Sequence, residues 1–261
     1  MLPPLALELL LTPTSQYKIR NRILAALPAA EYASLAGHLS LTTLDLGQTL
    51  HRHGDVIEYV YFVETGFISA LTILSDGQPL EIGLIGSEGV AGFSVILGTD
   101  TSYAETMCQT GGEAYRMPAH ALVQAFKQSL VLRDLLLRYV LIFQVQVAQT
   151  AACNAYHALE QRLARWLLAA HDRSGTPELS LTQDLIAVML GVRRATVSIA
   201  ASTLQRAGVI RYQHGKITIV NRTGLEDAAC ECHEAVNGEY RRLFGEYIAP
   251  VAPVAPVAPA A

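Results

Sequence analysis

Residues 182 to 206 carry side chains whose types and spacing suit contact with a nucleic acid. The segment reads TQDLIAVMLGVRRATVSIAASTLQR, with paired arginines followed by serine, threonine and glutamine at short intervals. A guanidinium group can bond to O6 and N7 of guanine, a serine hydroxyl can bond to either base type, and an apolar side chain can contact the thymine methyl group. This segment is therefore a candidate for base contacts in a DNA groove.

The apolar positions of the same segment indicate two helices that cross. A first helix is expected over residues 183–190, ending at Gly191, and a second begins near Arg194. Ala187 permits a close approach of the two helices, and Gly191 accepts the left-handed conformation of a tight turn. This is helix-turn-helix spacing. The positions expected to face inward are Ile186, Ala187, Val192, Val197, Ala200, Ala201 and Leu204.

The outward face of the second helix is expected to enter the major groove, where its N-terminal residues meet base edges. We predict that Arg194 and Ser198 contact bases and that Ile199 covers a thymine methyl group or the DNA backbone. Thr182 and Gln183 are placed for phosphate contacts at a helix N-terminus, although Thr182 is an equally good N-cap. The other predicted DNA contacts are Arg193, Thr196, Ser202, His214 and Lys216.

The sequence VIRYQHGKITIV, which follows directly, predicts two strands joined at His214-Gly215. Such a hairpin after a recognition helix is a wing, from which Arg211, His214 and Lys216 could meet phosphates. Charge supports this reading, because residues 155–224 hold nine Lys and Arg against four Asp and Glu, while the whole chain has a net charge of −4. The basic charge is thus confined to the part that would bind a polyanion.

Residues 44–117 show a different pattern, with short apolar or alternating runs and frequent glycines. This pattern predicts a small antiparallel barrel or sandwich, and Asp76-Gly77 suits the turn of a hairpin. Helices are expected over residues 16–40, split at Pro28, and over 118–127, 129–151 and 155–171.

The helix at 129–151 is long and carries one broad apolar stripe. A two-fold partner would offer the same stripe, so the stripe is a candidate dimer contact; the alternative is that it packs inside its own chain. The stripe consists of Leu132, Leu135, Leu136, Tyr139, Ile142, Phe143, Gln146 and Val147.

Two further groups of residues suggest metal chemistry. His51-x-His53 offers two of the usual four ligands, and Cys230-x-Cys232-His233 offers softer ligands that could bind a metal or sense redox. The four cysteines, Cys108, Cys153, Cys230 and Cys232, are too few and scattered for a disulfide framework. A small buried C-terminal helix explains the last group as well. We therefore predict no metal and no cofactor.

The order of helix, glycine-rich β-roll, long apolar helix and winged helix resembles the Crp/Fnr superfamily of bacterial transcription regulators. The resemblance runs from about Ile23 to Cys232 and rests on LGQTLHRHGDVIEYVYFVETGFIS, DGQPLEIGLIGSEGVAG and LTQDLIAVMLGVRRATVSIAASTLQRAGVIRYQHGKITI. It implies an α+β fold with a jelly-roll-like N-terminal antiparallel β-roll, flanking helices, a long dimerisation helix and a C-terminal winged helix-turn-helix. It also implies a homodimer on a palindromic operator.

The chain departs from the family at its ligand-binding segments. Cyclic-nucleotide-binding members carry a Glu and an Arg where this chain has Val90-Ala91-Gly92-Phe93 and Ser102-Tyr103-Ala104. A buried phosphate without its cation is poorly compensated, so we expect no tight binding of cyclic AMP. Oxygen-sensing members hold an iron-sulfur cluster on clustered N-terminal cysteines, and the first cysteine here is Cys108. Ala195 and Ile199 also replace a Glu and an Arg of the cyclic AMP regulator, which predicts a different operator.

The resulting prediction is a cytoplasmic, sequence-specific DNA-binding regulator that is not an enzyme. Double-stranded DNA and a second copy of the chain are the expected partners, RNA polymerase and an unidentified small-molecule effector are open candidates, and no membrane span is expected. Two alternatives stay open: a cyclic-nucleotide-dependent regulator with an altered pocket, and a sensor or protein-interaction module whose winged helix does not bind DNA.

The predicted divisions of the chain are an N-terminal extension (1–15), a cyclic-nucleotide-binding-like sensor domain (16–128), the dimerisation helix (129–153), the winged helix-turn-helix (154–235) and a helix end with a disordered Ala/Pro/Val tail (236–261).

Overall fold

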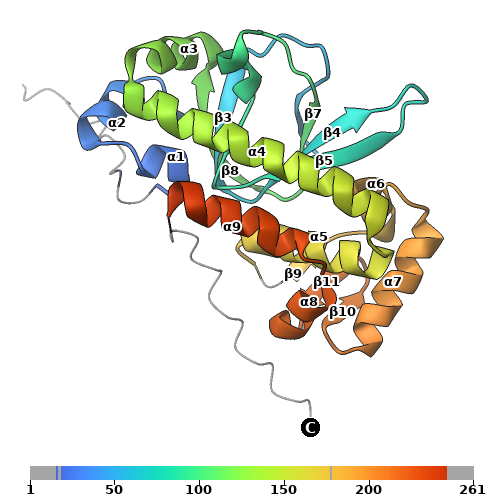
Figure 1. Cartoon of the computed structure of the whole chain (residues 1–261). Coiled ribbons are helices and arrows are strands. Elements are labelled where there is room, and N and C mark those ends of the chain that lie inside the picture. The colour runs from blue at the N-terminus through green and yellow to red at the C-terminus, as the bar shows by residue number, and fades with distance from the viewer. Residues whose placement is uncertain (1–15, 17–18, 177, 246–261) are drawn as a thin grey trace, which may run out of the picture.

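Two antiparallel four-stranded sheets build the N-terminal half of the molecule in the computed structural model, which describes residues 16, 19–176 and 178–245. The strand orders are β1-β8-β3-β6 and β2-β7-β4-β5 (Figure 1). The predicted N-terminal extension and most of the predicted Ala/Pro/Val tail lie outside the described residues. The strands are β1 (Ser40–Leu44), β2 (Thr49–His51), β3 (Tyr59–Thr65), β4 (Ile68–Ile73), β5 (Pro79–Ile85), β6 (Val90–Ala91), β7 (Glu105–Cys108) and β8 (Gly112–Pro118).

The β4–β5 hairpin confirms the turn predicted at Asp76-Gly77. Leu74 donates its backbone N–H to the carbonyl of Gln78 across 2.9 Å, and Gly77 has a φ of 83°. The first strand was predicted too late, because pairing begins at Ser40, opposite Arg116 of β8. That partner is 76 residues away, and a local pattern does not reveal it.

Helices cover one side of the sheets, and the longest, α4 (Leu130–Tyr156), crosses the whole molecule (Figure 1). The side chain of Ser129 caps it by accepting the backbone N–H of Leu132. The predicted break at Pro28 is confirmed by two short helices, and α4 runs five residues beyond the predicted end. The helices of this half are α1 (Arg22–Ala25), α2 (Ala29–Ala36), η2 (Phe93–Leu97) and α3 (Ala119–Gln128).

The apolar stripe proposed as a dimer contact packs largely inside its own chain. Leu132, Leu136, Tyr139 and Phe143 belong to the hydrophobic core of the roll, and Ile142 packs against α9 (Cys232–Phe244). The helix carries apolar residues on more than one side, so the choice of stripe from sequence was wrong. The large apolar side chains that α4 leaves exposed in its middle are Leu137 and Leu141.

The C-terminal half begins with α5 (Leu159–Ser174), four residues later than predicted because α4 extends to Tyr156. A three-stranded sheet of order β10-β11-β9 follows. Helix α9 runs antiparallel to α4 (Figure 1), as two contacts at opposite ends show: Arg138 with Leu243, and Gln149 with Cys232. The remaining elements are β9 (Glu178–Ser180), α6 (Gln183–Leu190), α7 (Arg194–Arg206), β10 (Ile210–Gln213), β11 (Lys216–Ile219) and α8 (Arg222–Ala228).

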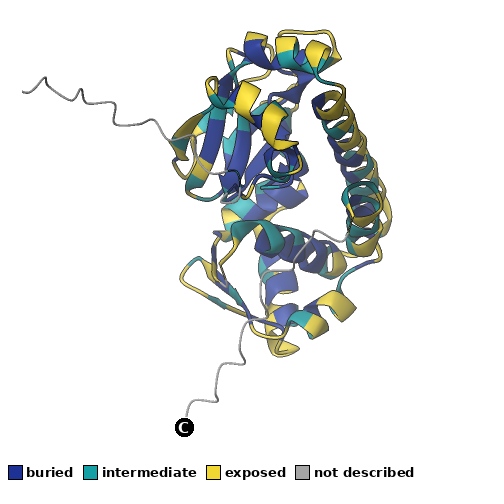
Figure 2. Cartoon of the chain, turned by 90° about the vertical axis from the view of Figure 1, so that its left-hand side faces the viewer, coloured by how far each residue is buried: buried dark blue, intermediate teal, exposed yellow. Residues whose placement is uncertain are grey.

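The two halves share a hydrophobic core rather than meeting only through a linker. Phe67, Leu71 and Leu84 of the roll belong to the same buried cluster as Trp166 of α5. Figure 2 shows this buried region running through the junction of the two halves. Within the described ranges no single helix has the length and apolar composition of a membrane span, and the bent pair α6 and α7 meets that test by length and composition only.

Candidate nucleic-acid interface

Helices α6 and α7 form the predicted helix-turn-helix, with their axes bent by 103° at the turn. Thr182 is the N-cap of α6, because its Oγ1 accepts the N–H of Leu185 across 3.2 Å. Gly191 ends α6 with a φ of 63°, as predicted for the turn. Six of the seven predicted inward residues are buried, and Val192 is half-buried against them.

The outward face of α7 is exposed where DNA contacts were predicted. Arg193, Arg194, Thr196 and Ser202 are exposed on the N-terminal and central turns of the helix, and Ser198 is half-buried. Ile199 leaves 64% of its surface exposed. The helix therefore presents cationic, hydroxyl and apolar groups on one accessible side.

Arg194 faces an acidic neighbour on the preceding helix. Its Nε lies 3.6 Å from Oδ1 of Asp184, and both side chains are mostly exposed. An exposed pair of this kind contributes about 1 kcal/mol or less, so the guanidinium group can exchange this partner for another acceptor. Arg194 therefore lies at the surface of the helix pair without being buried.

The predicted wing is present as the β10–β11 hairpin with a two-residue loop. His214 and Gly215 have φ values of 50° and 75°, the left-handed conformations of such a loop. Lys216 points to Glu178 of β9, with 2.7 Å between Nζ and Oε1, so part of the positive charge expected on the wing is neutralised. His214 and Arg211 are exposed.

Gln205 has a role that the sequence did not reveal. It lies on the exposed face of α7, and its Oε1 accepts the backbone N–H of Tyr212 across 2.7 Å. The hydroxyl of Tyr212 in turn donates to the carbonyl of Leu181 across 3.1 Å. These bonds join the first strand of the wing to α7 and to the residue that precedes the N-cap of α6. The tyrosine in this strand was the available signal in the sequence.

The nine cationic side chains of residues 155–224 divide into two groups. Four of them make contacts within the protein or are buried. Arg162 donates to the carbonyl of Leu190, Arg173 pairs with Glu88, Arg222 pairs with Asp172, and Arg165 is buried. The exposed members lie on α7 and the wing, and so concentrate positive charge at the candidate interface. They are Arg193, Arg194, Arg206, Arg211 and Lys216.

Aromatic side chains of the roll and of α4 pack together around Phe93. The ring of Phe93 lies 5.1 Å from that of Phe143 and 5.7 Å from that of Tyr139. A Cβ atom added at Gly89 would lie only 2.4 Å from the Tyr139 ring, which shows how closely α4 approaches this segment. Ser102 is buried and donates its hydroxyl to the carbonyl of Ala104.

The histidines that could have formed a metal pair are engaged elsewhere. The ring nitrogens of His51 lie 2.9 Å from Oγ1 of Thr106 and 2.8 Å from the carbonyl oxygen of Tyr59. Burial lowers the pKa of His51, which favours the neutral ring. His53 lies 2.9 Å from the carbonyl oxygen of Tyr103. The two imidazoles therefore serve the roll rather than one ion.

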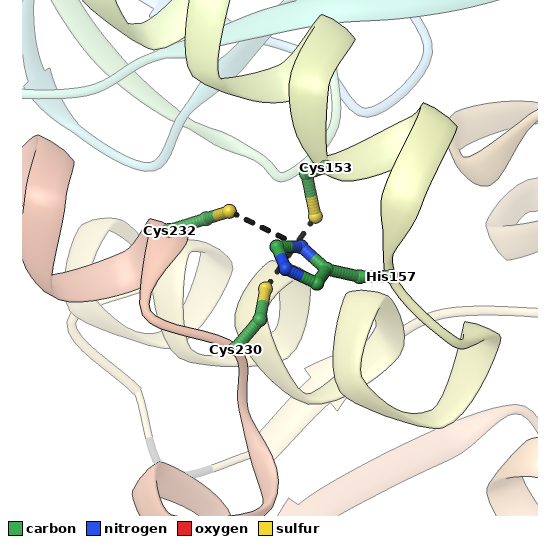
Figure 3. A group of neighbouring side chains, drawn as sticks. All are labelled: Cys153, His157, Cys230 and Cys232. Carbon is green, nitrogen blue, oxygen red and sulfur yellow. Dashed lines mark hydrogen bonds between the residues drawn. The ribbon is translucent and has the colours of Figure 1, made fainter.

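The predicted Cys230-x-Cys232-His233 group is rearranged in three dimensions. His233 turns away from the cysteines, with its Nε2 3.3 Å from Oδ2 of Asp172. Cys230 and Cys232 instead meet Cys153 and His157 from the end of α4 (Figure 3). This partnership was invisible to the sequence, because the two pairs lie more than 70 residues apart.

Comparison with known proteins agrees with this architecture. Residues 161–228 match the Crp-like helix-turn-helix domain, and residues 41–129 match the cyclic nucleotide-binding domain. The global nitrogen regulator of Synechocystis is 25% identical over 192 residues, which cover 70% of this chain and 85% of that protein. The transcriptional activator FnrL of Cereibacter sphaeroides is 25% identical over 212 residues, covering 77% and 85%.

Solved structures show the same fold. FixK2 of Bradyrhizobium japonicum aligns with a TM-score of 0.63 at 19% identity, over 74% of this chain and 98% of FixK2. The c-di-GMP responsive regulator CLP of Xanthomonas campestris aligns with a TM-score of 0.61 at 18% identity, over 74% of this chain and 99% of that chain. The predicted α+β fold is confirmed.

Proposed function

Because the chain belongs to the Crp/Fnr superfamily of transcription regulators, we propose that it binds a palindromic operator as a homodimer and places one α7 helix in the major groove of each half-site. The observation that carries this proposal is the exposed face of α7, where Arg194, Ser198 and Ile199 lie on one side of a helix whose opposite side is buried. Side chains that contact base edges must lie on an accessible face of the helix, while the opposite face packs on the rest of the protein.

The proposed role of each exposed residue follows from its chemistry. Arg194 and Ser198 contact base edges, and Ile199 contacts a thymine methyl group or the DNA backbone. Arg193, Thr196 and Ser202 flank them and contact phosphates or neighbouring bases. The wing residues His214 and Lys216 and the N-terminal residues of α6, Thr182 and Gln183, contact phosphates; Thr182 does so while it caps the helix.

The proposed dimer uses the face of α4 that the roll and α9 leave uncovered. Leu137 and Leu141 are 45% and 44% exposed, and Gln144, Ala148, Ala151 and Ala155 continue the same face toward the end of the helix. These positions alternate in steps of three and four residues, which is the spacing of a two-helix coiled coil. Large side chains at one end and alanines at the other would let paired helices approach most closely near the DNA-binding halves.

The roll is proposed to respond to an effector other than cyclic AMP. Residues 90–104 contain neither Lys nor Arg. The ring of Phe93, within this segment, packs against the rings of Tyr139 and Phe143. A buried anionic phosphate would lack a compensating cation there. We further propose that the protein works in the cytoplasm, contacts RNA polymerase at promoters and catalyses no reaction.

Selection of bound fragments from a random DNA pool, followed by fluorescence anisotropy on the selected duplex, tests this function. The expected result is a palindromic consensus and an affinity that falls steeply as salt rises, because bound cations release phosphate counterions. Equal affinity for the selected and scrambled duplexes at low salt would overturn the proposal. Binding of a protein partner with little salt dependence would instead favour the interaction-module alternative.

A further inference from the structure

Four metal-binding side chains from two distant parts of the chain converge at the end of α4. Cys153 and His157 are four residues apart on the last turn of α4 and its C-cap, and therefore lie on one side of it. Cys230 lies in the connection between α8 and α9, and Cys232 begins α9. One ligand atom from each residue lies within 4.8 Å of all the others (Figure 3).

Two of the six distances between these atoms are known individually, and both lie close to those of tetrahedral coordination. The Sγ atoms of Cys153 and Cys230 are 3.5 Å apart, and Sγ of Cys232 is 3.4 Å from Nδ1 of His157. With Zn–S bonds of about 2.3 Å and Zn–N bonds of about 2.0 Å, neighbouring ligands of a tetrahedral zinc ion are separated by roughly 3.5 to 3.8 Å. A disulfide bond, at about 2.05 Å, is much shorter than the observed sulfur separation.

Surrounding residues orient the ligands in the way that metal sites require. Oε1 of Glu231 lies 3.3 Å from Nε2 of His157, so a proton on Nε2 leaves Nδ1 free to bind a cation. Nε2 of Gln149 donates to Sγ of Cys232 across 3.1 Å, a hydrogen bond that orients this sulfur. Both partners are polar side chains directed at the cluster from outside.

We propose that Cys153, His157, Cys230 and Cys232 bind a Zn²⁺ ion in a closed tetrahedral site. Three thiolates and one imidazole favour zinc over the hard cations magnesium and calcium, and four protein ligands leave no position for substrate water. The three cysteines are buried and His157 is half-buried. Cys230 also lines a cavity of about 420 Å³, together with Glu231 and His233 among others.

The position of the site at the end of α4 gives the ion a structural role. His157 is the residue at which α4 ends, and α5 of the DNA-binding half begins at Leu159. Cys230 and Cys232 follow the wing and α8 along the chain. Zinc would therefore join the long helix to the segment downstream of the wing and fix the junction between α4 and the DNA-binding half. This inference stands independently of the proposed operator binding.

The test uses the full chain purified under reducing conditions. Elemental analysis is expected to find one zinc per chain, and titration of the zinc-free protein with Co²⁺ is expected to give thiolate-to-cobalt charge-transfer absorption with the visible bands of a tetrahedral ion. Cys153→Ser and Cys232→Ser should each lose these signals. Cys108→Ala removes a buried thiol of the roll, and His233→Ala removes the neighbouring imidazole; both controls should keep the signals.

A second variant distinguishes a loss of zinc binding from a loss of folding. Glu231→Gln changes an exposed carboxylate that orients His157, and it should weaken zinc binding about tenfold in competition with a chromophoric chelator while the helical circular dichroism stays the same. The proposal is overturned if the reduced wild-type chain gives no cobalt–thiolate absorption. It is equally overturned if mass spectrometry finds a Cys153–Cys230 disulfide in the metal-free protein as purified from the cell.

Discussion

Trp166 donates its indole N–H to Oε1 of Glu81 across 2.6 Å, and this bond joins α5 of the DNA-binding half to strand β5 of the roll. The other carboxylate oxygen of Glu81 accepts the hydroxyl of Ser69 across 2.5 Å. Both Glu81 and Trp166 are buried. A polar contact inside a shared hydrophobic core fixes the relative position of the two halves more specifically than apolar packing does.

Trp166→Phe should destabilise the protein by about 1 to 3 kcal/mol, because it leaves a buried carboxylate oxygen without its donor while keeping most of the apolar surface. Chemical denaturation measures the change. Tyr156→Phe is the matched control, since Tyr156 is 86% exposed and its replacement should change the free energy of unfolding by about 0.5 kcal/mol or less. Equal stabilities of the two variants would contradict a role for this bond.

Glu81 should make stability depend on pH in the neutral range. Burial raises the pKa of its carboxyl from 4.5 to about 7, against the opposing effect of hydrogen bonds from Ser69 and Trp166. The folded protein thus keeps a proton that the unfolded chain releases near pH 4.5. The contribution, on the order of a few kcal/mol, is complete below that pH and is lost as the pH rises through about 7. Glu81→Gln should flatten this part of the stability profile, measured as thermal midpoints from pH 5 to 8; parallel profiles would disprove the assignment.

Arg194→Ala should relax base preference at one operator position. A good bidentate arginine–guanine contact contributes about 1 to 3 kcal/mol of discrimination, so the affinities for duplexes that differ at that position should converge. Arg206→Ala removes the same charge from the exposed last turn of α7 and should lower the affinity for all duplexes by the same factor. Anisotropy titrations on single-base operator variants measure both, and unchanged discrimination in Arg194→Ala would exclude the proposed base contact.

Leu141→Asp should convert the proposed dimer to monomer at micromolar concentration, because it buries a charge in the middle of the helix pair. Sedimentation velocity measures the change. Leu46→Asp provides the control, since it makes the same substitution on an exposed leucine between β1 and β2 of the roll. If both variants sediment as the wild type does, the dimer uses another surface.

Isothermal titration calorimetry with cyclic AMP should give no submicromolar binding. The reason is that residues 90–104 contain neither Lys nor Arg. Within this segment the ring of Phe93 packs against Tyr139 of α4. A tight, stoichiometric isotherm would favour the alternative of a cyclic-nucleotide-dependent regulator with an altered pocket.

The local parts of the fold could be predicted from the amino-acid sequence. The helix-turn-helix was predictable because its inward residues, its turn at Gly191 and its arginine-tipped second helix fall within 25 consecutive positions. The hairpin at Asp76-Gly77 was predictable for the same reason, since the turn conformation depends on the residues that form it. The exposed face of α7 followed from helical periodicity once the buried face was identified.

Which surfaces meet depends on how the whole chain folds. Periodicity shows that α4 buries a stripe, but whether the stripe meets the roll, α9 or a second chain depends on residues far away in the sequence. For the same reason the sequence did not show that Lys216 pairs with Glu178, or that Cys230 lies with Cys153 and His157 rather than with His233. Side-chain chemistry is encoded locally, whereas the partner of each side chain is set by how distant segments pack.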